Sequence, residues 1–332
     1  MDPLLCNLLG VLVFWDARTL SFVGGVLTLL GAASAVVVAL RRRVDSGLDP
    51  AIIETFRMRV RAWWVLCTVL AAAFLMGLTA TVVLFWLIAF WALREFITLT
   101  PTRPSDHRTL FWVFFLCTPL QFALVAMNWY GLYSILIPVY AFLLIPTNIA
   151  LSGDPKRFLE RSAKIQAGLL ICVYCLSYAP ALLTLDLKND DPGGQVRLLF
   201  YFIVMVQLSD VLQYAWSQLP SKHVIVPSIN PTKTWEGLLG GAATMALLGA
   251  ALWWATPFPY WMAAGMGLVI ALMGTAGSLT MSAIKRDRGV KDYGTLVVGH
   301  GGVLDRIDSL CFAAPVFFHF TRFFLLSIEK NG

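Results

Sequence analysis

Residues 63–93 read WWVLCTVLAAAFLMGLTATVVLFWLIAFWAL, a run of 31 residues without one charged side chain. A helix crosses the hydrocarbon core of a bilayer with roughly 20 apolar residues. A single helix over all 31 residues would be about 46 Å long, which is too long for one crossing at modest tilt. The run is therefore either one strongly tilted helix or a hairpin of two short helices that breaks near residues 77–81.

Similar runs fill the rest of the chain, in which 58% of the 332 residues are hydrophobic and 13% are charged. That charged share is about half of the share in soluble domains, and the mean hydropathy is +0.75. The runs are continuous rather than alternating, which indicates helices and not a barrel. We predict an all-α polytopic membrane protein with about 9–11 transmembrane helices. The other predicted spans are 20–40, 109–127, 131–151, 166–185, 197–219, 236–255, 260–284 and 310–328, and the short run 4–15 is re-entrant, interfacial or a further span.

Lys and Arg are distributed unevenly between the loops. Residues 41–62 carry six Arg against three acidic residues, and residues 152–165 carry four basic residues against two acidic ones. Residues 186–197 carry two basic and three acidic residues. By the positive-inside rule the first two loops are cytoplasmic and the third is not. Counting spans then favours the hairpin for residues 63–93, and it places three more segments in the cytoplasm: 94–108, 220–235 and 285–308.

The chain divides into residues 1–165, transmembrane helices with basic cytoplasmic loops, and residues 166–332, a C-terminal transmembrane region that carries the chemically informative residues. The six cysteines lie in or beside apolar runs, and the pair Cys172 and Cys175 has no neighbouring His or acidic residue. We therefore interpret the cysteines as packing residues and expect no disulfide. The net charge of +6 suits a protein that faces anionic lipid headgroups or anionic substrates.

Ser209 and Asp210 lie inside the apolar run LLFYFIVMVQLSDVLQYAW. An ionised acid at this depth is costly unless it has a partner, so Asp210 is a functional candidate. The alternative is hydrogen bonding between helices, since Gln207, Gln213 and Gln218 also make this helix partly polar.

The segment PSINPTKTWEG, residues 227–237, places Asn230, Lys233 and Thr234 directly before the next span. Lys and Thr at a helix N-terminus suit a phosphate group. The segment lacks the glycines of a Walker A loop, and a Lys at a membrane boundary can also be a simple topology anchor.

The charged stretch KRDRGVKDYGTLVVGHGGVLDRID, residues 285–308, ends with Asp305 and Asp308, which share a face if they are helical. Two such carboxylates suit Mg²⁺, which takes one or two carboxylates together with substrate phosphates. Gly301 and Gly302 permit a close approach of the backbone, and His300 would bond a phosphate or orient a carboxylate. The alternative is a surface cluster of ion pairs with Arg306.

Three segments in this order resemble the phosphatidate cytidylyltransferases, also called CDP-diacylglycerol synthases, over roughly residues 197–318. Ser209–Asp210, followed by Tyr214, resembles the family's S-D pair, and NPTKTWEGLLGG resembles its S-P-x-K-T-W-E-G segment. The C-terminal signature S-x-x-K-R, K-D, H-G-G and D-R-x-D falls on Ser282, Lys285, Arg286, Lys291, Asp292, His300, Gly301, Gly302, Asp305, Arg306 and Asp308.

The resemblance implies that CTP and phosphatidate, or a related lipid phosphate, react to CDP-diacylglycerol and pyrophosphate with Mg²⁺ as cofactor. It implies a homodimer among membrane lipids, without nucleic acid, in the bacterial inner membrane or a eukaryotic organelle membrane. We favour the bacterial inner membrane, and the loop charges place the active site on the cytoplasmic face. The catalytic residues would be Asp305, Asp308, Lys285, Lys291 and Asp292. Substrate would be bound by Ser209, Asn230, Lys233, Thr234, Ser282, Arg286, His300, Gly301, Gly302 and Arg306, and metal by Asp305, Asp308 and Asp210.

Several positions depart from the family pattern. Ser278 and Met281 stand where the family often has Asp and Glu, Asn230 replaces the usual Ser, and the glycines common after the S-D helix are missing from SQLPSKH. Two alternatives therefore stay open beside the phosphatidate reaction. One is the same chemistry on a different lipid phosphate, and the other is a catalytically weak, lipid-binding paralogue.

Overall fold

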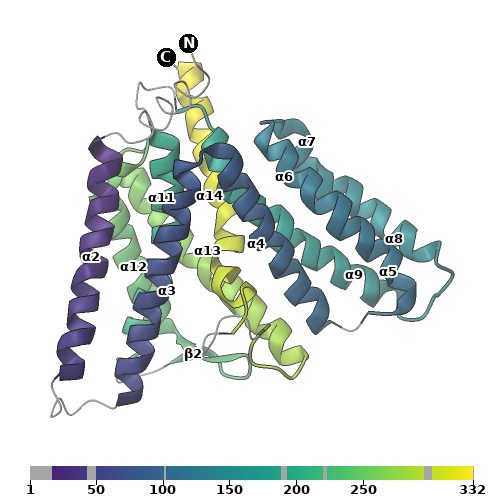
Figure 1. Cartoon of the computed structure of the whole chain (residues 1–332), viewed down its shortest axis with the longest axis horizontal. Coiled ribbons are helices and arrows are strands. Elements are labelled where there is room, and N and C mark those ends of the chain that lie inside the picture. The colour runs from purple at the N-terminus through teal and green to yellow at the C-terminus, as the bar shows by residue number, and fades with distance from the viewer. Residues whose placement is uncertain are drawn as a thin grey trace.

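Helices make up most of the computed structural model, which describes residues 17–42, 50–100, 102–187, 193–219, 223–294 and 301–331. Eight helical segments in these ranges are long and apolar enough to cross a membrane. Figure 1 shows the helices spreading from a narrow upper end toward a wider lower end. The all-α polytopic class predicted from the sequence is confirmed.

The first part of the chain forms three long helices and then three segments that each contain a π-helical turn. The long helices are α2 (Ala17–Arg42), α3 (Pro50–Leu75) and α4 (Leu78–Leu99). The first interrupted segment is η1 (Pro104–Asp106), α5 (His107–Trp112), η2 (Val113–Cys117) and α6 (Thr118–Ala126). The next is α7 (Tyr130–Ile135), η3 (Leu136–Ala141) and α8 (Phe142–Ala150), and the last is α9 (Phe158–Leu169), η4 (Leu170–Cys175), α10 (Leu176–Ala181) and η5 (Leu182–Thr184).

The second part carries the residues of the three family-like segments. Its elements are α11 (Gly194–Trp216), β1 (Val224–Val226), β2 (Asn230–Thr234), α12 (Trp235–Ala251), η6 (Trp253–Ala255), α13 (Tyr260–Asp287) and α14 (Leu304–Asn331). The antiparallel hairpin β1–β2 pairs Val224 with Thr234 and Val226 with Asn230. No strand was expected from the sequence, and this hairpin lies at the lower end of the molecule (Figure 1).

The run 63–93 is a hairpin, as the charges of its flanking loops predicted. α3 ends at Leu75 and α4 begins at Leu78, and Gly77 between them has a φ of 91°. Glycine adopts this left-handed conformation without the steric cost that a side chain brings. Figure 1 shows α3 and α4 running in opposite directions.

Three predicted loops are shorter than expected, because helices continue beyond the apolar runs. α3 begins at Pro50, α9 at Phe158 and α14 at Leu304, within segments that were predicted as the loops 41–62, 152–165 and 285–308. Arg, Lys and Glu are good helix formers, so a helix does not have to end where its apolar residues end.

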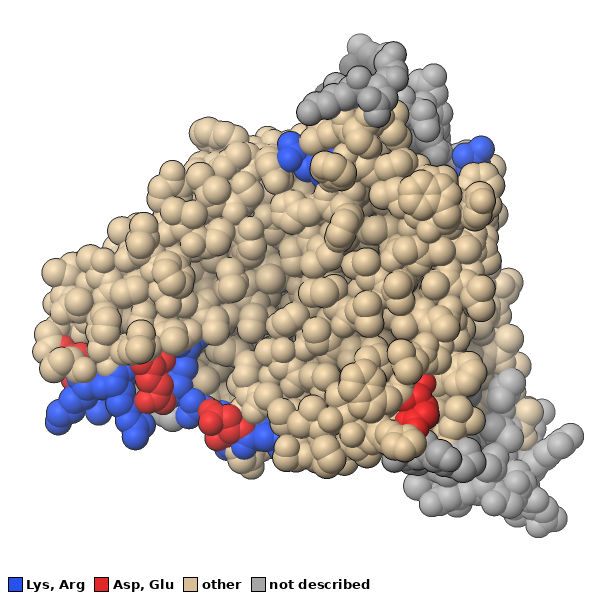
Figure 2. Space-filling view, turned by 180° about the vertical axis from the view of Figure 1, so that it is seen from behind, with Lys and Arg blue, Asp and Glu red and all other residues tan. Residues whose placement is uncertain are grey.

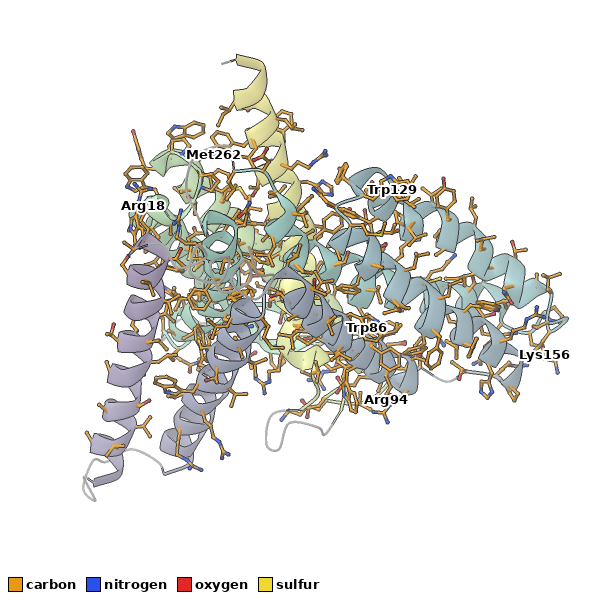
Figure 3. All side chains as sticks on the ribbon, turned by 45° about the horizontal axis from the view of Figure 1, so that its top comes forward. Arg18, Trp86, Arg94, Trp129, Lys156 and Met262 are labelled. Atoms are coloured by element: carbon orange, nitrogen blue, oxygen red, sulfur yellow. The ribbon has the colours of Figure 1, made fainter. Side chains whose placement is uncertain are left out.

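The predicted cytoplasmic segments share one end of the molecule. α4 and α13 end there, and α9 and α14 begin there (Figure 1). Figure 2 shows Lys, Arg, Asp and Glu gathered along this lower edge, with few charged residues above it. In Figure 3 the labelled Arg94 and Lys156 lie toward the lower end, and Arg18, Trp129 and Met262 lie toward the opposite end. The shared end agrees with the predicted topology, while its cytoplasmic orientation stays a prediction.

Cysteine labelling tests that orientation. In a background without the native cysteines, we expect Val290→Cys to react with an impermeant thiol reagent only from the cytoplasmic side. Asp190→Cys should react only from the other side, because the two positions are predicted on opposite faces. Reaction of both positions from the same side would contradict the topology.

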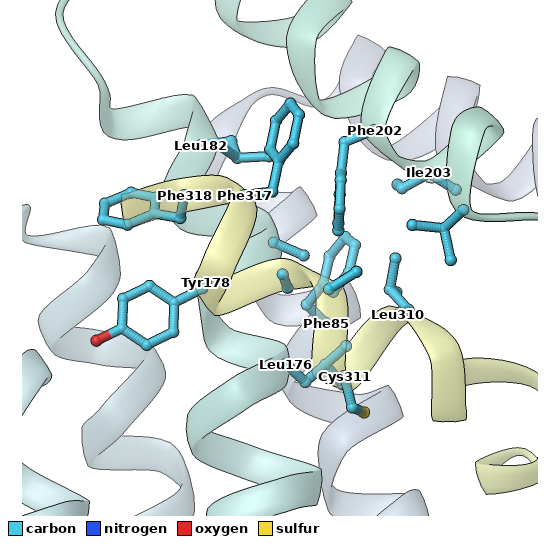
Figure 4. Packing of buried hydrophobic residues seen from close by; sticks show 14 of the residues in the cluster. Phe85, Leu176, Tyr178, Leu182, Phe202, Ile203, Leu310, Cys311, Phe317 and Phe318 are labelled. Carbon is cyan, nitrogen blue, oxygen red and sulfur yellow. The ribbon is translucent and has the colours of Figure 1, made fainter. Parts of the chain in front are cut away.

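The core surrounds α14 and fixes the helix whose first turns carry Asp305 and Asp308. Phe317 of α14 stacks on Phe202 of α11 with ring centroids 4.8 Å apart, and Phe318 packs on Tyr178 of α10 at 5.1 Å (Figure 4). All four rings are buried. Packing of this kind, rather than the hydrophobic effect alone, drives the association of helices in a bilayer.

Candidate active site

Polar side chains of α11 meet residues of three other elements at the lower end. Asp210 Oδ1 accepts a hydrogen bond from Lys233 Nζ at 3.3 Å, and Asp210 Oδ2 accepts one from the Ser309 hydroxyl at 2.8 Å. Gln213 Oε1 accepts from Lys233 Nζ at 3.2 Å and from the Thr275 hydroxyl at 2.8 Å. Helices α11, α13 and α14 and strand β2 therefore converge on one cluster.

Ser209 has a structural role in this arrangement. It is buried, and its Oγ accepts a hydrogen bond from Gln213 Nε2 at 2.9 Å. The polar face of α11 was interpreted either as a functional site or as hydrogen bonding between helices, and the two interpretations apply to different residues. Ser209 bonds to Gln213 within α11, and Gln213 Nε2 also donates to the Ala271 carbonyl of α13 at 3.2 Å and so joins the two helices. Asp210 keeps 37% of its side chain exposed.

The hairpin β1–β2 brings Lys233 to Asp210 because α12, which follows the hairpin directly, packs closely on α11. A Cβ at Gly237 would lie 2.7 Å from the Gln213 carbonyl oxygen, and one at Gly241 would lie 2.5 Å from Gln213 Cγ. The hydroxyl of Thr234 accepts from the Gly237 amide at 3.0 Å and caps α12. The predicted ligand role of Thr234 thus coincides with a capping role.

Asn230 and Arg286 fasten the hairpin to the end of α13. Asn230 Nδ2 donates to the Ser282 hydroxyl at 3.1 Å, and Arg286 Nε donates to the Ile229 carbonyl at 3.2 Å. These three predicted substrate-binding residues, Asn230, Ser282 and Arg286, therefore lie together where the hairpin meets the end of α13.

Asp305 has three polar contacts. Its Oδ1 pairs with Lys285 Nζ at 2.7 Å, where the exposed fractions of the two side chains are 8% and 15%. Its Oδ2 accepts from the backbone amides of Tyr293 at 2.8 Å and Gly302 at 2.9 Å, and a Cβ at Gly301, whose φ is 81°, would lie 2.8 Å from it. Asp305 thereby links the backbone at Tyr293 and at Gly302 to the first turn of α14.

Asp308 lies close enough to Asp210 for the two carboxylates to interact electrostatically. Its Oδ1 accepts from the Ser309 amide at 2.7 Å, and the Ser309 hydroxyl contacts Asp210. A Cβ at Gly277 of α13 would lie 2.6 Å from the Asp308 carbonyl oxygen, so glycine is needed for α13 to approach this closely. The structure thus brings Asp210 and Asp308 together. Asp305 instead forms an ion pair with Lys285.

The carboxylates fit Mg²⁺ as a pair. No group of three or more His, Cys, Asp or Glu side chains is close enough to hold a metal ion within the described ranges. Mg²⁺ does not need such a group, since one or two carboxylates suffice when phosphates and waters complete its coordination. Asp210 and Asp308 meet this requirement, whereas Asp305 is already engaged by an ammonium group and two amides.

A small cavity of about 40 Å³ adjoins this cluster. It has room for a few water-sized groups, and its lining includes Asp210, Tyr214, Thr232, Lys233 and Thr275. A nucleotide is much larger than this cavity, so the cavity could enclose only part of one.

The remaining predicted residues lie at the rim or outside the described chain. Lys291 and Asp292 are exposed on the turn after α13, and Arg306 is exposed on the first turn of α14. His300 lies outside the described residues. The sequence reasoning missed four contributors: Glu95, Thr275, Tyr293 and Ser309. Only Glu95 offered a signal, as an acid close to the end of an apolar span.

A sequence profile described as the cytidylyltransferase family matches residues 57–324. The chain belongs to this family. Membership confirms the resemblance found in the three segments, and it extends the match into the first half of the chain.

Named relatives in the cytidylyltransferase family include one long match and several shorter ones. "Uncharacterized protein YnbB" of Escherichia coli (strain K12) is 40% identical over 274 residues, which are 80% of this chain and 87% of that protein. A phosphatidate cytidylyltransferase of Mycobacterium leprae (strain TN) is 37% identical over 169 residues, 50% of this chain and 52% of that one. One of Synechocystis sp. (strain ATCC 27184 / PCC 6803 / Kazusa) is 46% identical over 105 residues, 31% and 36% of the two chains. The chain thus aligns with about half or less of the length of these two phosphatidate cytidylyltransferases.

Proposed function

We propose that this protein transfers the cytidylyl group of CTP to the phosphate of a membrane lipid, with phosphatidate as the acceptor. The products are then CDP-diacylglycerol and pyrophosphate. One observation carries the proposal: residues of three distant segments meet at one end of the helices, where lysines face carboxylates. Lys233 contacts Asp210, and Lys285 contacts Asp305. Two relatives in the family are named phosphatidate cytidylyltransferases.

In this reaction a phosphate oxygen of the lipid forms a bond to the α-phosphorus of CTP, and the bond from that phosphorus to the pyrophosphate oxygen breaks. Negative charge develops on oxygen atoms, so catalysis consists mainly of positioning and electrostatic stabilisation. A lysine ammonium has three donors. Lys233 uses two of them on Asp210 and Gln213, which leaves one for a phosphate oxygen.

The metal prediction becomes more specific at this point. Asp210 and Asp308 would hold Mg²⁺, which when bound neutralises phosphate charge and polarises phosphoryl oxygens. Asp305, paired with Lys285, holds the backbone amides of Tyr293 and Gly302 in place. Positive charge at the rim of the site comes from Lys291, Arg286 and Arg306. The basic loops support a cytoplasmic orientation in the bacterial inner membrane, and a homodimer stays a prediction from the family resemblance.

The direct test uses purified protein, labelled CTP, Mg²⁺ and a panel of lipid phosphates. We expect pyrophosphate release that depends on the lipid and is fastest with phosphatidate. Faster pyrophosphate release with an ether lipid or a polyprenyl phosphate would show that this lipid, and not phosphatidate, is the acceptor of the same cytidylyl transfer. No release with any lipid phosphate would contradict the proposal.

Ser278 favours the alternative of a catalytically weak paralogue. It lies one turn from Gly274, whose carbonyl contacts the Ser309 hydroxyl at 3.2 Å, and one turn from Ser282, which contacts Asn230. By helical spacing Ser278 shares their face, where a carboxylate would add negative charge near Asp210 and Asp308.

We therefore expect Ser278→Asp to lower the Mg²⁺ concentration for half-maximal activity roughly threefold or more, because affinity for a hard cation rises with the number of charged ligands. Ser278→Asn is the matched control of equal size, and pyrophosphate release across a Mg²⁺ titration is the measurement. Identical curves for the two variants would show that the departure does not affect metal binding. A wild type that is silent until Ser278→Asp restores turnover would make this chain an inactive family member.

A further inference from the structure

Glu95 is a buried acid of the first half of the chain that contacts the first turn of α14. It lies near the end of α4 and is 5% exposed. Its Oε1 accepts a hydrogen bond from the Val303 amide at 3.0 Å, and its Oε2 accepts one from the Leu304 amide at 2.8 Å. The first amides of a helix have no partner within the helix, so Glu95 caps α14 from a different helix.

Two glycines make room for this carboxylate. A Cβ at Gly294 would lie 2.9 Å from Glu95 Oε1, and a Cβ at Gly302 would collide with the same carboxylate. Gly302 was predicted to let a ligand approach the backbone. Its close neighbour within the protein is instead the side chain of Glu95.

The charge of Glu95 is balanced by the helix itself. The described chain places no Lys, Arg or His within ion-pair distance of this carboxylate. A buried charge is costly unless it is hydrogen-bonded or paired. The amides and the dipole at the N-terminus of a helix stabilise an anion at this position.

We propose that Glu95 is a positioning residue for the site, which rests on the proposed function above. By holding the Val303 and Leu304 amides, Glu95 fixes where α14 begins. Asp305 follows directly, and Asp308 lies one turn further on. Through this contact a residue of α4 sets the position of the Asp305 and Asp308 carboxylates of α14. α4 itself lies outside the three family-like segments.

The test compares Glu95→Ala and Glu95→Gln with the wild type. We expect Glu95→Ala to lower kcat by about tenfold to a hundredfold, because small displacements of catalytic groups cost about this much. Its KM for CTP should change much less, and its Mg²⁺ requirement should rise. Glu95→Gln keeps one acceptor oxygen, so its loss should be smaller. Hydrogen–deuterium exchange of peptides covering residues 301–304 should be faster in Glu95→Ala than in the wild type.

Gly302→Ala gives an independent check through a double-mutant cycle. Alone, it should lower kcat strongly, because its methyl group meets the Glu95 carboxylate. In the Glu95→Ala background the same change should cost little more, since the obstacle is gone. Asp106→Asn is the matched control, because that buried carboxylate pairs with Arg161 of α9. It should lower the melting temperature and leave kcat per folded protein unchanged.

The outcomes separate the two proposals. Unchanged exchange at residues 301–304 in Glu95→Ala, or fully multiplicative effects of Glu95→Ala and Gly302→Ala, overturns the role of Glu95 even if the enzyme is active. Faster exchange in a protein whose wild type turns over no lipid phosphate leaves the Glu95 contact in place and overturns the proposed function alone.

Discussion

Asp308→Asn should lower the turnover number with CTP and phosphatidate by at least about a hundredfold, or roughly 2.7 kcal/mol of activation free energy. The variant keeps the size of the side chain and the acceptor for the Ser309 amide, but it removes the negative charge that a hard cation requires. Asp210→Asn should have a comparable effect. Pyrophosphate release over a Mg²⁺ titration, together with the melting temperature, measures both.

Asp305→Asn provides the contrast. We expect it to lose activity as well, but with a clear fall in melting temperature, because Lys285 is then left nearly buried without its counter-ion. Breaking a buried ion pair in this way costs about 3–5 kcal/mol. If Asp308→Asn instead destabilises the protein and leaves Mg²⁺-dependent turnover intact, the metal pair is assigned wrongly.

Lys233→Gln should reduce kcat/KM for CTP by about a hundredfold, or roughly 2.7 kcal/mol. The Lys233 ammonium is mostly enclosed, with 16% of the side chain exposed, and lies between Asp210 and Gln213. Gln keeps hydrogen bonding but not the charge that a phosphate oxygen needs in the transition state. Steady-state kinetics at saturating Mg²⁺ and a thermal melt of the same preparation measure the change.

Two other lysines serve as comparisons for the effect of Lys233→Gln on kcat/KM. Lys291→Gln should have a smaller effect on kcat/KM for CTP, because Lys291 is exposed on the turn after α13. Lys156→Gln should have none, since Lys156 lies in the turn before α9. Parallel losses of folded protein and of activity in Lys233→Gln would favour the anchor role over the phosphate role.

The spans were predictable because apolar length and the placement of Arg and Lys are properties of short windows. The hairpin of residues 63–93 followed from both, and its break falls at Gly77. The exact helix starts did not follow, since Pro50 and Phe158 begin helices within basic segments. The strands of the hairpin were missed because Asn230–Thr234 pairs with residues only a few positions away, across a tight turn without an alternating pattern.

The sequence was sufficient to predict which residues belong to the site. It was not sufficient to predict which of these side chains contact one another. Helical spacing put Asp305 and Asp308 on one face, which suggested a shared metal. The structure gives them different neighbours, Lys285 for Asp305 and the Ser309–Asp210 contact for Asp308. The contact of Glu95 with the Val303 amide joins positions 208 residues apart in the chain, and no local pattern encodes a pairing at that separation.

All carboxylates and lysines of the cluster lie at the same end of the helices, and this location limits which lipids the protein can reach. On the proposed function, acceptor and product both belong to the leaflet in contact with that end. In sealed vesicles with uniformly oriented protein, the reaction would consume the acceptor lipid of one leaflet. Its rate would then fall to the rate at which acceptor lipid flips spontaneously from the other leaflet. Product would accumulate on one side, and the two monolayers would differ in headgroup charge and in area per lipid.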